Sequence, residues 1–310
     1  MKILITGVHG FVGSNLVAAL SKEHTIYGLD IVSPIKEGVR FTFSWDYLDK
    51  PNEIPDVDAI IHLAGKAHDT KNQTEADVYF KVNTGLTQKI LDWFLKQPKC
   101  KKFVFFSTAK AAADKVDGVL TEDVVPSPVG PYGESKIAAE KYIQEHMPTD
   151  KQEYIFRPCM IHVPVNKVNL NLLYNMVRKG IPWPLGAFDK RRTFTSVQNI
   201  CFAVNGVITK DVPSGIYNMG DDEALSTNEL IEEICKSLGK KAHIWKLPKG
   251  LMTGFAKIGG WLHLPLNPER LCKLTESYVS SNAKIKAALG VEKMPVDARE
   301  GLKVTLNSFK

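Results

Sequence analysis

The chain has 310 residues, of which 44% are hydrophobic and 24% charged, a balance typical of a globular protein with one or two folded units. Its formal charge of +6 is spread along the sequence without a zinc-finger spacing or a long basic arm, so we expect no nucleic-acid partner. The five cysteines are an odd, widely spaced set without a C-x-x-C pair, so we expect reduced thiols and no metal site.

Strand and helix patterns alternate over the first half of the chain. Short apolar runs predict strands, and apolar residues at intervals of three and four predict the helices between them. The predicted strands are 2–6, 25–29, 59–63, 103–106 and 154–156, and the predicted helices are 11–20, 79–95 and 132–144. Because continuous apolar strands suit a sheet covered on both faces, the pattern predicts an α/β fold with a Rossmann-type, doubly wound parallel sheet.

The later part of the chain has a looser pattern, with a proline-rich stretch, a predicted helix at 170–178 and a predicted strand at 216–219. Ser226, followed three residues later by Glu229, matches a capping box that opens a further helix. Gly239 is placed to end that helix.

These patterns suggest two units: a dinucleotide-binding Rossmann domain at 1–160, and a smaller C-terminal region at 161–310 that mainly binds substrate and returns to the sheet near 188–220.

The most apolar late stretch, 251–266, contains Lys257 and four glycine or proline residues. It is shorter than the roughly 20 residues of a membrane span, so we expect no membrane insertion. The chain opens on a strand pattern rather than a signal sequence, which favours a cytoplasmic protein.

A glycine-rich turn joins the first strand to the first helix. Gly7 suits a tight turn, Gly10 lets the backbone approach a pyrophosphate, and Gly13 allows close packing of helix on strand. The N-terminus of the helix offers free N–H groups to phosphates. The residues that we expect to line the cofactor here are Gly7, His9, Gly10, Phe11, Val12 and Gly13, with His9 acting through its backbone.

Asp30 ends the second predicted strand, 23 residues after Gly7. A carboxylate at this place accepts hydrogen bonds from both ribose hydroxyls and repels a 2′-phosphate, which favours NAD over NADP. Lys36 leaves NADP open. Alternatively, Asp30 is only a turn residue at a strand end.

Tyr132 and Lys136 are four residues apart on a predicted helix, which places them on one face about 5–6 Å apart at Cβ. An ammonium and an oxidised nicotinamide nearby would both favour the tyrosinate over the phenol, whose ordinary pKa is about 10. The pair would then act as a general base for a sugar or alcohol hydroxyl. Thr108, at the end of the fourth strand, could share the proton.

In this order, the motifs resemble those of the extended short-chain dehydrogenases, in the NAD-dependent epimerase/dehydratase family, over essentially the whole chain. The matching segments are TGVHGFVG at 6–13, Asp30, Asp46-Tyr47, HLAG at 62–65, Asn83 in VNTG, Ser107-Thr108, Tyr132 with Lys136, Arg157-Pro158, RRTFTSVQNI at 191–200 and YNMGDDEALSTNEL at 217–230.

The resemblance implies a role for each matching residue. Thr108, Tyr132 and Lys136 would form the catalytic triad. The implied cofactor contacts beyond the glycine turn are Asp30, Asp46, Tyr47, Leu63, Ala64, Gly65, Lys66, Asn83, Tyr132, Lys136, Arg157 and Pro158. The implied substrate contacts are Thr108, Asn169, Arg192 and Arg270, with Arg192 on the diphosphate of a nucleotide-sugar. Arg191 in place of Arg192, and a purely structural Asn83, remain alternatives.

Two segments depart from the family pattern. Family members that dehydrate a sugar resemble Ser-Thr-Asp-Glu where this chain has Ser107-Thr108-Ala109-Lys110, so the sequence disfavours 4,6-dehydration. Val163-Pro164 replaces the usual glycine-proline pair in a loop near the sugar. The identity of the sugar is therefore open.

Three functions follow. The first is an NAD-dependent 4-epimerase of a UDP-hexose or UDP-N-acetylhexosamine, acting by transient oxidation at C4. The second is an NAD(P)H-dependent reductase of a UDP-4-keto-6-deoxy sugar, and the third is a non-catalytic dinucleotide sensor.

The resemblance also implies a homodimer paired through the helices at 79–95 and 132–144. His62 is expected to be packed and hydrogen-bonded, whereas His162 could touch the substrate.

Overall fold

The computed structural model describes residues 1–50, 52–67, 74–162, 170–261 and 267–309. Its central element is a seven-stranded sheet in the order β10-β7-β5-β4-β1-β2-β3, in which every pairing is parallel. The strands are β1 (Lys2–Thr6), β2 (Thr25–Leu29), β3 (Val39–Phe43), β4 (Ala59–His62), β5 (Lys102–Phe106), β7 (Gln152–Pro158) and β10 (Gly215–Met219). The order reverses between β1 and β4, where sheets of this type bind ligands at the carboxyl ends of the strands.

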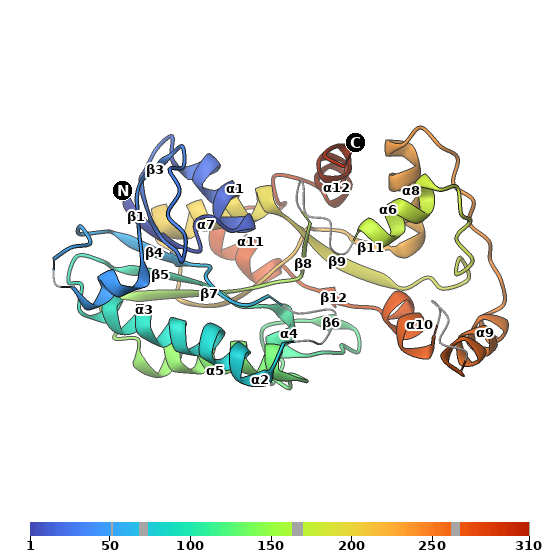
Figure 1. Ribbon diagram of the computed structural model, residues 1–310, viewed down its shortest axis with the longest axis horizontal. Coiled ribbons are helices and arrows are strands. Elements are labelled where there is room, and N and C mark those ends of the chain that lie inside the picture. The colour runs from blue at the N-terminus through green and yellow to red at the C-terminus, as the bar shows by residue number, and fades with distance from the viewer. Residues whose placement is uncertain (51, 68–73, 163–169, 262–266, 310) are drawn as a thin grey trace.

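Helices cover both faces of this sheet (Figure 1). One layer holds α1 (Phe11–Leu20), α7 (Val197–Thr209) and α11 (Ala283–Leu289), and the other holds α3 (Leu86–Leu95) and α5 (Pro131–His146). Strands between two helical layers are buried on both sides, and all four residues of β4 are buried. The predicted α/β fold with a doubly wound parallel sheet is confirmed.

The segment predicted as one helix at 79–95 contains an interruption. Helix α2 (Ala76–Tyr79) passes into a π-helical turn, Phe80–Gly85, before α3 begins. Such turns insert one residue into the α-helical repeat and often occur at functional sites. Three further short elements lie at this end of the sheet: the 3₁₀ turn Trp45–Asp49, α4 (Ala109–Ala112) and β6 (Val119–Leu120).

The C-terminal part adds small sheets and a second apolar core. Strands β11 (Ala224–Ser226), β9 (Arg191–Ser196) and β8 (Met160–His162) form one sheet, and β12 (Val279–Ser280) pairs with β6. The helices are α6 (Asn171–Arg178), α8 (Thr227–Ser237), α9 (Lys249–Trp261), α10 (Pro268–Thr275) and α12 (Ala298–Asn307). The predicted capping box is present, since Ser226 and Glu229 bond reciprocally at the start of α8. Figure 1 shows α8, α9 and α10 at the end of the molecule away from the N-terminus.

The C-terminal half of the chain also contributes to the main sheet. β10 pairs with β7, and residues of α7 and α11 share a core with those of β1 and α1. No helix in the described part of the chain is long and apolar enough to cross a membrane.

Candidate active site

The glycine turn lies at the carboxyl end of β1. Gly7 has φ +68°, in the left-handed region that favours glycine. A Cβ on Gly13 would lie 2.4 Å from the carbonyl oxygen of Gly7, and one on Gly7 would lie 3.0 Å from the nitrogen of Ala64. The turn, α1 and the segment after β4 therefore pack too closely for a side chain at these two positions.

Helix α1 begins at this turn with its N-terminus open to a ligand. Its N-cap is Gly10, and no side chain caps its first N–H groups. The carboxylate of Asp30 accepts hydrogen bonds from the backbone N–H of His9 at 2.9 Å and of Ile31 at 2.8 Å. Asp30 thus braces the glycine turn at the end of β2, a placement that fits a dinucleotide with its phosphates on α1. The His9 ring lies 3.3 Å from the Thr42 hydroxyl.

The two expected adenine neighbours follow β3. Asp46 is exposed and lies 2.8 Å from the ammonium of Lys50. Hydrogen bonds from Lys50 and Ser44 lower the pKa of Asp46 to about 2. The Tyr47 ring packs against Phe43 with its centroid at 5.3 Å. Both residues follow the carboxyl end of β3, the neighbour of β2, and their contact with the adenine stays a prediction.

The segment after β4 is held by two side chains. The hydroxyl of Thr6 accepts from the backbone N–H groups of Leu63 at 3.2 Å and Ala64 at 3.0 Å. The amide of Asn83 accepts from the N–H of Lys66 at 2.7 Å and donates to its carbonyl at 3.2 Å. Leu63, Ala64, Lys66 and Asn83, all predicted cofactor residues, are thereby held near the glycine turn that follows Thr6.

Gly65 marks the point where this segment meets α5. A Cβ there would lie 2.9 Å from Oδ1 of Asn83 and 3.2 Å from Nζ of Lys136. Asn83 also donates to the hydroxyl of Ser135 at 3.0 Å. The π-helical turn that carries Asn83 lets one amide reach both the segment after β4 and α5. Asn83 is therefore a bracing residue that joins the cofactor side of the site to the catalytic helix.

Tyr132 and Thr108 come together at the carboxyl end of β5. A hydrogen bond between their side chains joins the two, and the Tyr79 ring lies 5.9 Å from that of Tyr132. Burial raises the pKa of Tyr132 above its ordinary value of 10, against a smaller lowering by Thr108. The two side chains are therefore adjacent, and their sharing of a proton stays a prediction.

Lys136 is buried one turn further along α5. Its ammonium donates to the carbonyl of Phe106 at 2.8 Å and lies 4.8 Å from the Phe105 ring. Burial lowers the pKa of Lys136 to about 8. That this ammonium and an oxidised nicotinamide together lower the pKa of Tyr132 stays a prediction.

A buried ionic network behind Lys136 escaped the sequence analysis. Glu140 is fully buried and accepts from Arg157 at 2.6 Å and 3.0 Å, and from the Ser107 hydroxyl. Its signal in the sequence was its spacing, four residues after Lys136. The Arg157 side chain is buried in this ion pair, and the cofactor contact at 157–158 stays a prediction.

Arg192 is the predicted substrate contact in the C-terminal part whose side chain the structure describes. Its Nε donates to the carbonyl of Glu276 at 3.1 Å, and partial burial lowers its pKa. Arg191 points the other way, to the carbonyl of Ala224 and the carboxylate of Glu229, which favours Arg192 as the ligand contact. Asn169 lies outside the described residues, as does the side chain of Arg270 on α10.

Both histidines weighed in the sequence are buried. His62 is buried between the hydroxyls of Thr6 at 2.6 Å and Thr87 at 3.0 Å. Burial, with a smaller effect of Lys136, lowers the pKa of His62 to about 3, so the ring is neutral. His162 is buried beside Thr305 at 3.1 Å and Asp221 at 3.3 Å, and its contact with a substrate stays a prediction.

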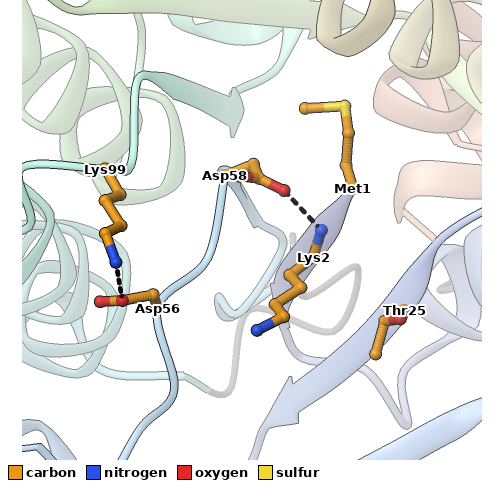
Figure 2. A pocket seen from close by; sticks show the side chains of 6 residues that line it. All are labelled: Met1, Lys2, Thr25, Asp56, Asp58 and Lys99. Atoms are coloured by element: carbon orange, nitrogen blue, oxygen red, sulfur yellow. Dashed lines mark hydrogen bonds and ion pairs between the residues drawn. The ribbon is translucent and has the colours of Figure 1, made fainter.

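A hollow lies at the other end of the strands, on the side of their amino ends (Figure 2). Its lining comes from the amino ends of the strands: Met1, Lys2, Thr25, Asp56, Asp58 and Lys99. Asp58 accepts from the backbone of Lys2 and Asp56 pairs with Lys99, each at 2.7 Å. Ligands of doubly wound sheets bind at the carboxyl ends of the strands, so this hollow is not the active site.

Known proteins resemble this chain over most of its length. A model of the NAD dependent epimerase/dehydratase family matches residues 3–220. The chain is 28% identical to UDP-glucose 4-epimerase of Vibrio cholerae, over 99% of this chain and 95% of that protein. It is 26% identical to N-acetyl-alpha-D-glucosaminyl-diphospho-ditrans,octacis-undecaprenol 4-epimerase of Escherichia coli O157:H7, over 92% of this chain and 84% of that protein.

The fold has solved counterparts. A structure of UDP-glucuronic acid 4-epimerase from Bacillus cereus in complex with NAD has a TM-score of 0.75 at 22% identity, covering 99% of this chain and 98% of that one. Sheet, glycine turn and Tyr/Lys helix define the class as an extended short-chain dehydrogenase, a Rossmann enzyme. The chain belongs to the NAD dependent epimerase/dehydratase family, and its cofactor is NAD.

Proposed function

We propose that this enzyme is an NAD-dependent 4-epimerase of a UDP-hexose or a UDP-N-acetylhexosamine. Support comes from the UDP-glucose 4-epimerase that aligns over 99% of the chain. A second relative is named as a 4-epimerase of a diphosphate-linked N-acetylglucosamine. Their shared features are a sugar, a diphosphate and a change at C4.

The observation that carries the proposal is the composition of the turn after β5. The side chains there are the hydroxyl of Thr108, bonded to Tyr132, and then Ala109 and Lys110. Lys110 is paired with Asp114 at 2.6 Å. Expulsion of a C6 hydroxyl needs an acid and a base at these two positions, and neither alanine nor an ion-paired lysine supplies them. The site can therefore move a proton at O4 but lacks groups for dehydration.

The bound nicotinamide would supply the acceptor and donor of the hydrogen at C4. Tyr132 would take the O4 proton, directly or through Thr108, and return it after the sugar has turned. The Lys136 ammonium, fixed on the Phe106 carbonyl, would stabilise the tyrosinate formed. Arg192 would hold the diphosphate while the sugar turns, since a guanidinium fork suits two phosphate oxygens.

The second candidate is a reductase of a UDP-4-keto-6-deoxy sugar, which uses the same residues in one direction. It is favoured by a 23% identical relative named GDP-6-deoxy-D-mannose reductase, aligned over 74% of this chain. A non-catalytic sensor is disfavoured because Thr108, Tyr132 and Lys136 are all present and adjacent in the fold.

The deciding experiment is incubation with a panel of UDP-sugars while C4 configuration and cofactor redox state are both followed. An epimerase interconverts the two C4 epimers of UDP-glucose or UDP-N-acetylglucosamine without net change in NAD. Net consumption of reduced cofactor with a 4-keto sugar would instead establish the reductase. Turnover of neither class, with NAD bound, would contradict both proposals.

Two wider expectations belong with this proposal. Residues 161–310 are assigned mainly to substrate binding, although β10 and α7 belong to the main sheet. A homodimer would pair α3 and α5, which are tied together in one subunit by a 2.7 Å bond between Tyr142 and Asp92. Light scattering that found only a monomer would remove the dimer.

A further inference from the structure

Helix α9 exposes large apolar side chains to solvent. Leu251 is 48% exposed, Phe255 52%, Ile258 53% and Trp261 81%. Since an α-helix turns by about 100° per residue, these positions fall within an arc of about 120°. We call this set the apolar face of α9.

The opposite side of the same helix is anchored. Met252 and Ala256 are buried in the C-terminal core together with Leu271 of α10. A Cβ on Gly260 would lie 3.1 Å from Pro268, so the end of α9 also lies close to α10. Surface helices normally turn polar residues outward. This helix is apolar on both sides, so its outer side is adapted to a non-aqueous partner.

The chain around the apolar face is basic. Between Glu233 and Glu269 the sequence has no acidic residue, and its six lysines are Lys236, Lys240, Lys241, Lys246, Lys249 and Lys257. Trp245, in the same stretch, is 55% exposed. Although Lys236 is paired with Glu233 at 2.7 Å, a stretch that combines exposed apolar and aromatic side chains with lysines and no acidic residue of its own is typical of segments that lie on anionic lipid surfaces.

We propose that α9 docks this protein on the surface of an anionic phospholipid bilayer. Thirteen residues give a helix about 20 Å long, too short to span a bilayer but long enough to lie in its interface. A second copy fits less well, because docking two such faces would bring together two copies of a stretch, 234–268, that has six lysines and no acidic residue. The positive charge of the segment complements lipid headgroups instead.

A chain of contacts through α10 connects the docking surface with the substrate side of the molecule. α9 packs on α10, and shortly after α10 the carbonyl of Glu276 accepts from Arg192 at 3.1 Å. Docking would therefore bring the diphosphate side of the site towards the membrane. The docking proposal depends on α9 and the lysine-containing stretch before it, and it holds whatever sugar the enzyme uses.

The test is co-sedimentation of the full-length protein with vesicles of equal parts phosphatidylglycerol and phosphatidylcholine, compared with pure phosphatidylcholine. We expect binding to the anionic vesicles that weakens as salt is added. A Phe255→Ser/Trp261→Ser variant should bind at least roughly tenfold more weakly than the wild type, because two aromatic side chains no longer enter the interface. Lys241→Gln/Lys246→Gln should lose the preference for anionic lipid.

The matched control is Phe41→Ser on β3, which removes a 51% exposed phenylalanine outside α9 and should leave vesicle binding unchanged. Thermal unfolding and NAD binding report whether each variant is folded. Equal binding by wild type and the α9 variant, or no binding to anionic vesicles, would overturn the proposal. A dimer in light scattering that the α9 variant abolishes would also overturn it, in favour of a second copy. None of these outcomes bears on the epimerase proposal.

Discussion

The carboxyl ends of the main-sheet strands (here called the sheet edge) and the apolar face of α9 differ in the side chains that they bury and expose. At the sheet edge, Asn83, Lys136 and Glu140 are buried, and each is hydrogen-bonded to a neighbour: to the Ser135 hydroxyl, the Phe106 carbonyl and the Arg157 guanidinium respectively. At α9, apolar side chains such as Phe255 and Trp261 face solvent. Burial of polar groups is costly and is offset here by their internal hydrogen bonds, whereas the exposure of the apolar face of α9 would be offset by the proposed lipid surface.

This comparison predicts that the two regions fail independently. Changes at the sheet edge should alter turnover, stability or pH dependence without altering vesicle binding. The largest effect is expected for Tyr132→Phe, which removes the proton-transfer group and should lower kcat about 10²–10⁴-fold. The measurement is epimerisation of the sugar identified in the UDP-sugar panel.

Tyr142→Phe is the matched control, because it removes a hydroxyl from the same helix that bonds Asp92 rather than Thr108. It should keep wild-type turnover. A Tyr132→Phe enzyme with bound NAD and undiminished turnover would show that the phenol takes no part in the reaction.

Glu140→Ala should be the most destabilising change at the sheet edge. It leaves the buried Arg157 guanidinium without its carboxylate, a loss of about 3–5 kcal/mol in the free energy of unfolding. Urea denaturation measures it. Asp56→Ala, at an exposed pair with Lys99, should unfold like the wild type. Equal stability of the two variants would mean that the network is not a structural brace.

Gly13→Ala tests the packing of the glycine turn. The added Cβ would lie 2.4 Å from the Gly7 carbonyl, so we expect a loss of about 1–3 kcal/mol together with weaker NAD binding. Calorimetry of unfolding and NAD titration measure the two effects. Gly254→Ala in α9 meets no atom within 4 Å and should be neutral or stabilise by about 0.5–1 kcal/mol. A tolerated Gly13→Ala would contradict the tight packing.

The smallest effect is expected in the pH profile. The pKa of Lys136 is lowered to about 8, so its ammonium is present below that pH and lost as the pH rises through it. Turnover should therefore fall on the alkaline side, to about half near that pKa. Lys136→Arg keeps its charge there, and any activity it retains should extend to higher pH. An unchanged alkaline limb in this variant would assign the titration to another group.

The candidate site was predictable wherever its residues are close in sequence. The glycine turn, the Tyr132/Lys136 spacing and the Ser226 capping box each depend on a few consecutive residues and on fixed helix or turn geometry. Glu140 with Arg157 was missed because the pair joins a helix to a strand. The π-helical turn at Asn83 was missed because the apolar spacing of 79–95 suits a plain α-helix.

The amino-acid sequence by itself determined the alternation of strands and helices, the glycine turn after β1 and the placing of Tyr132 and Lys136 on one helix, because local spacing sets all three. Only the tertiary structure decided that burial raises the pKa of Tyr132, that Arg192 rather than Arg191 turns inward, and that α9 leaves its apolar face uncovered. These outcomes depend on which neighbours each side chain meets after folding, and desolvation and burial are properties of that environment.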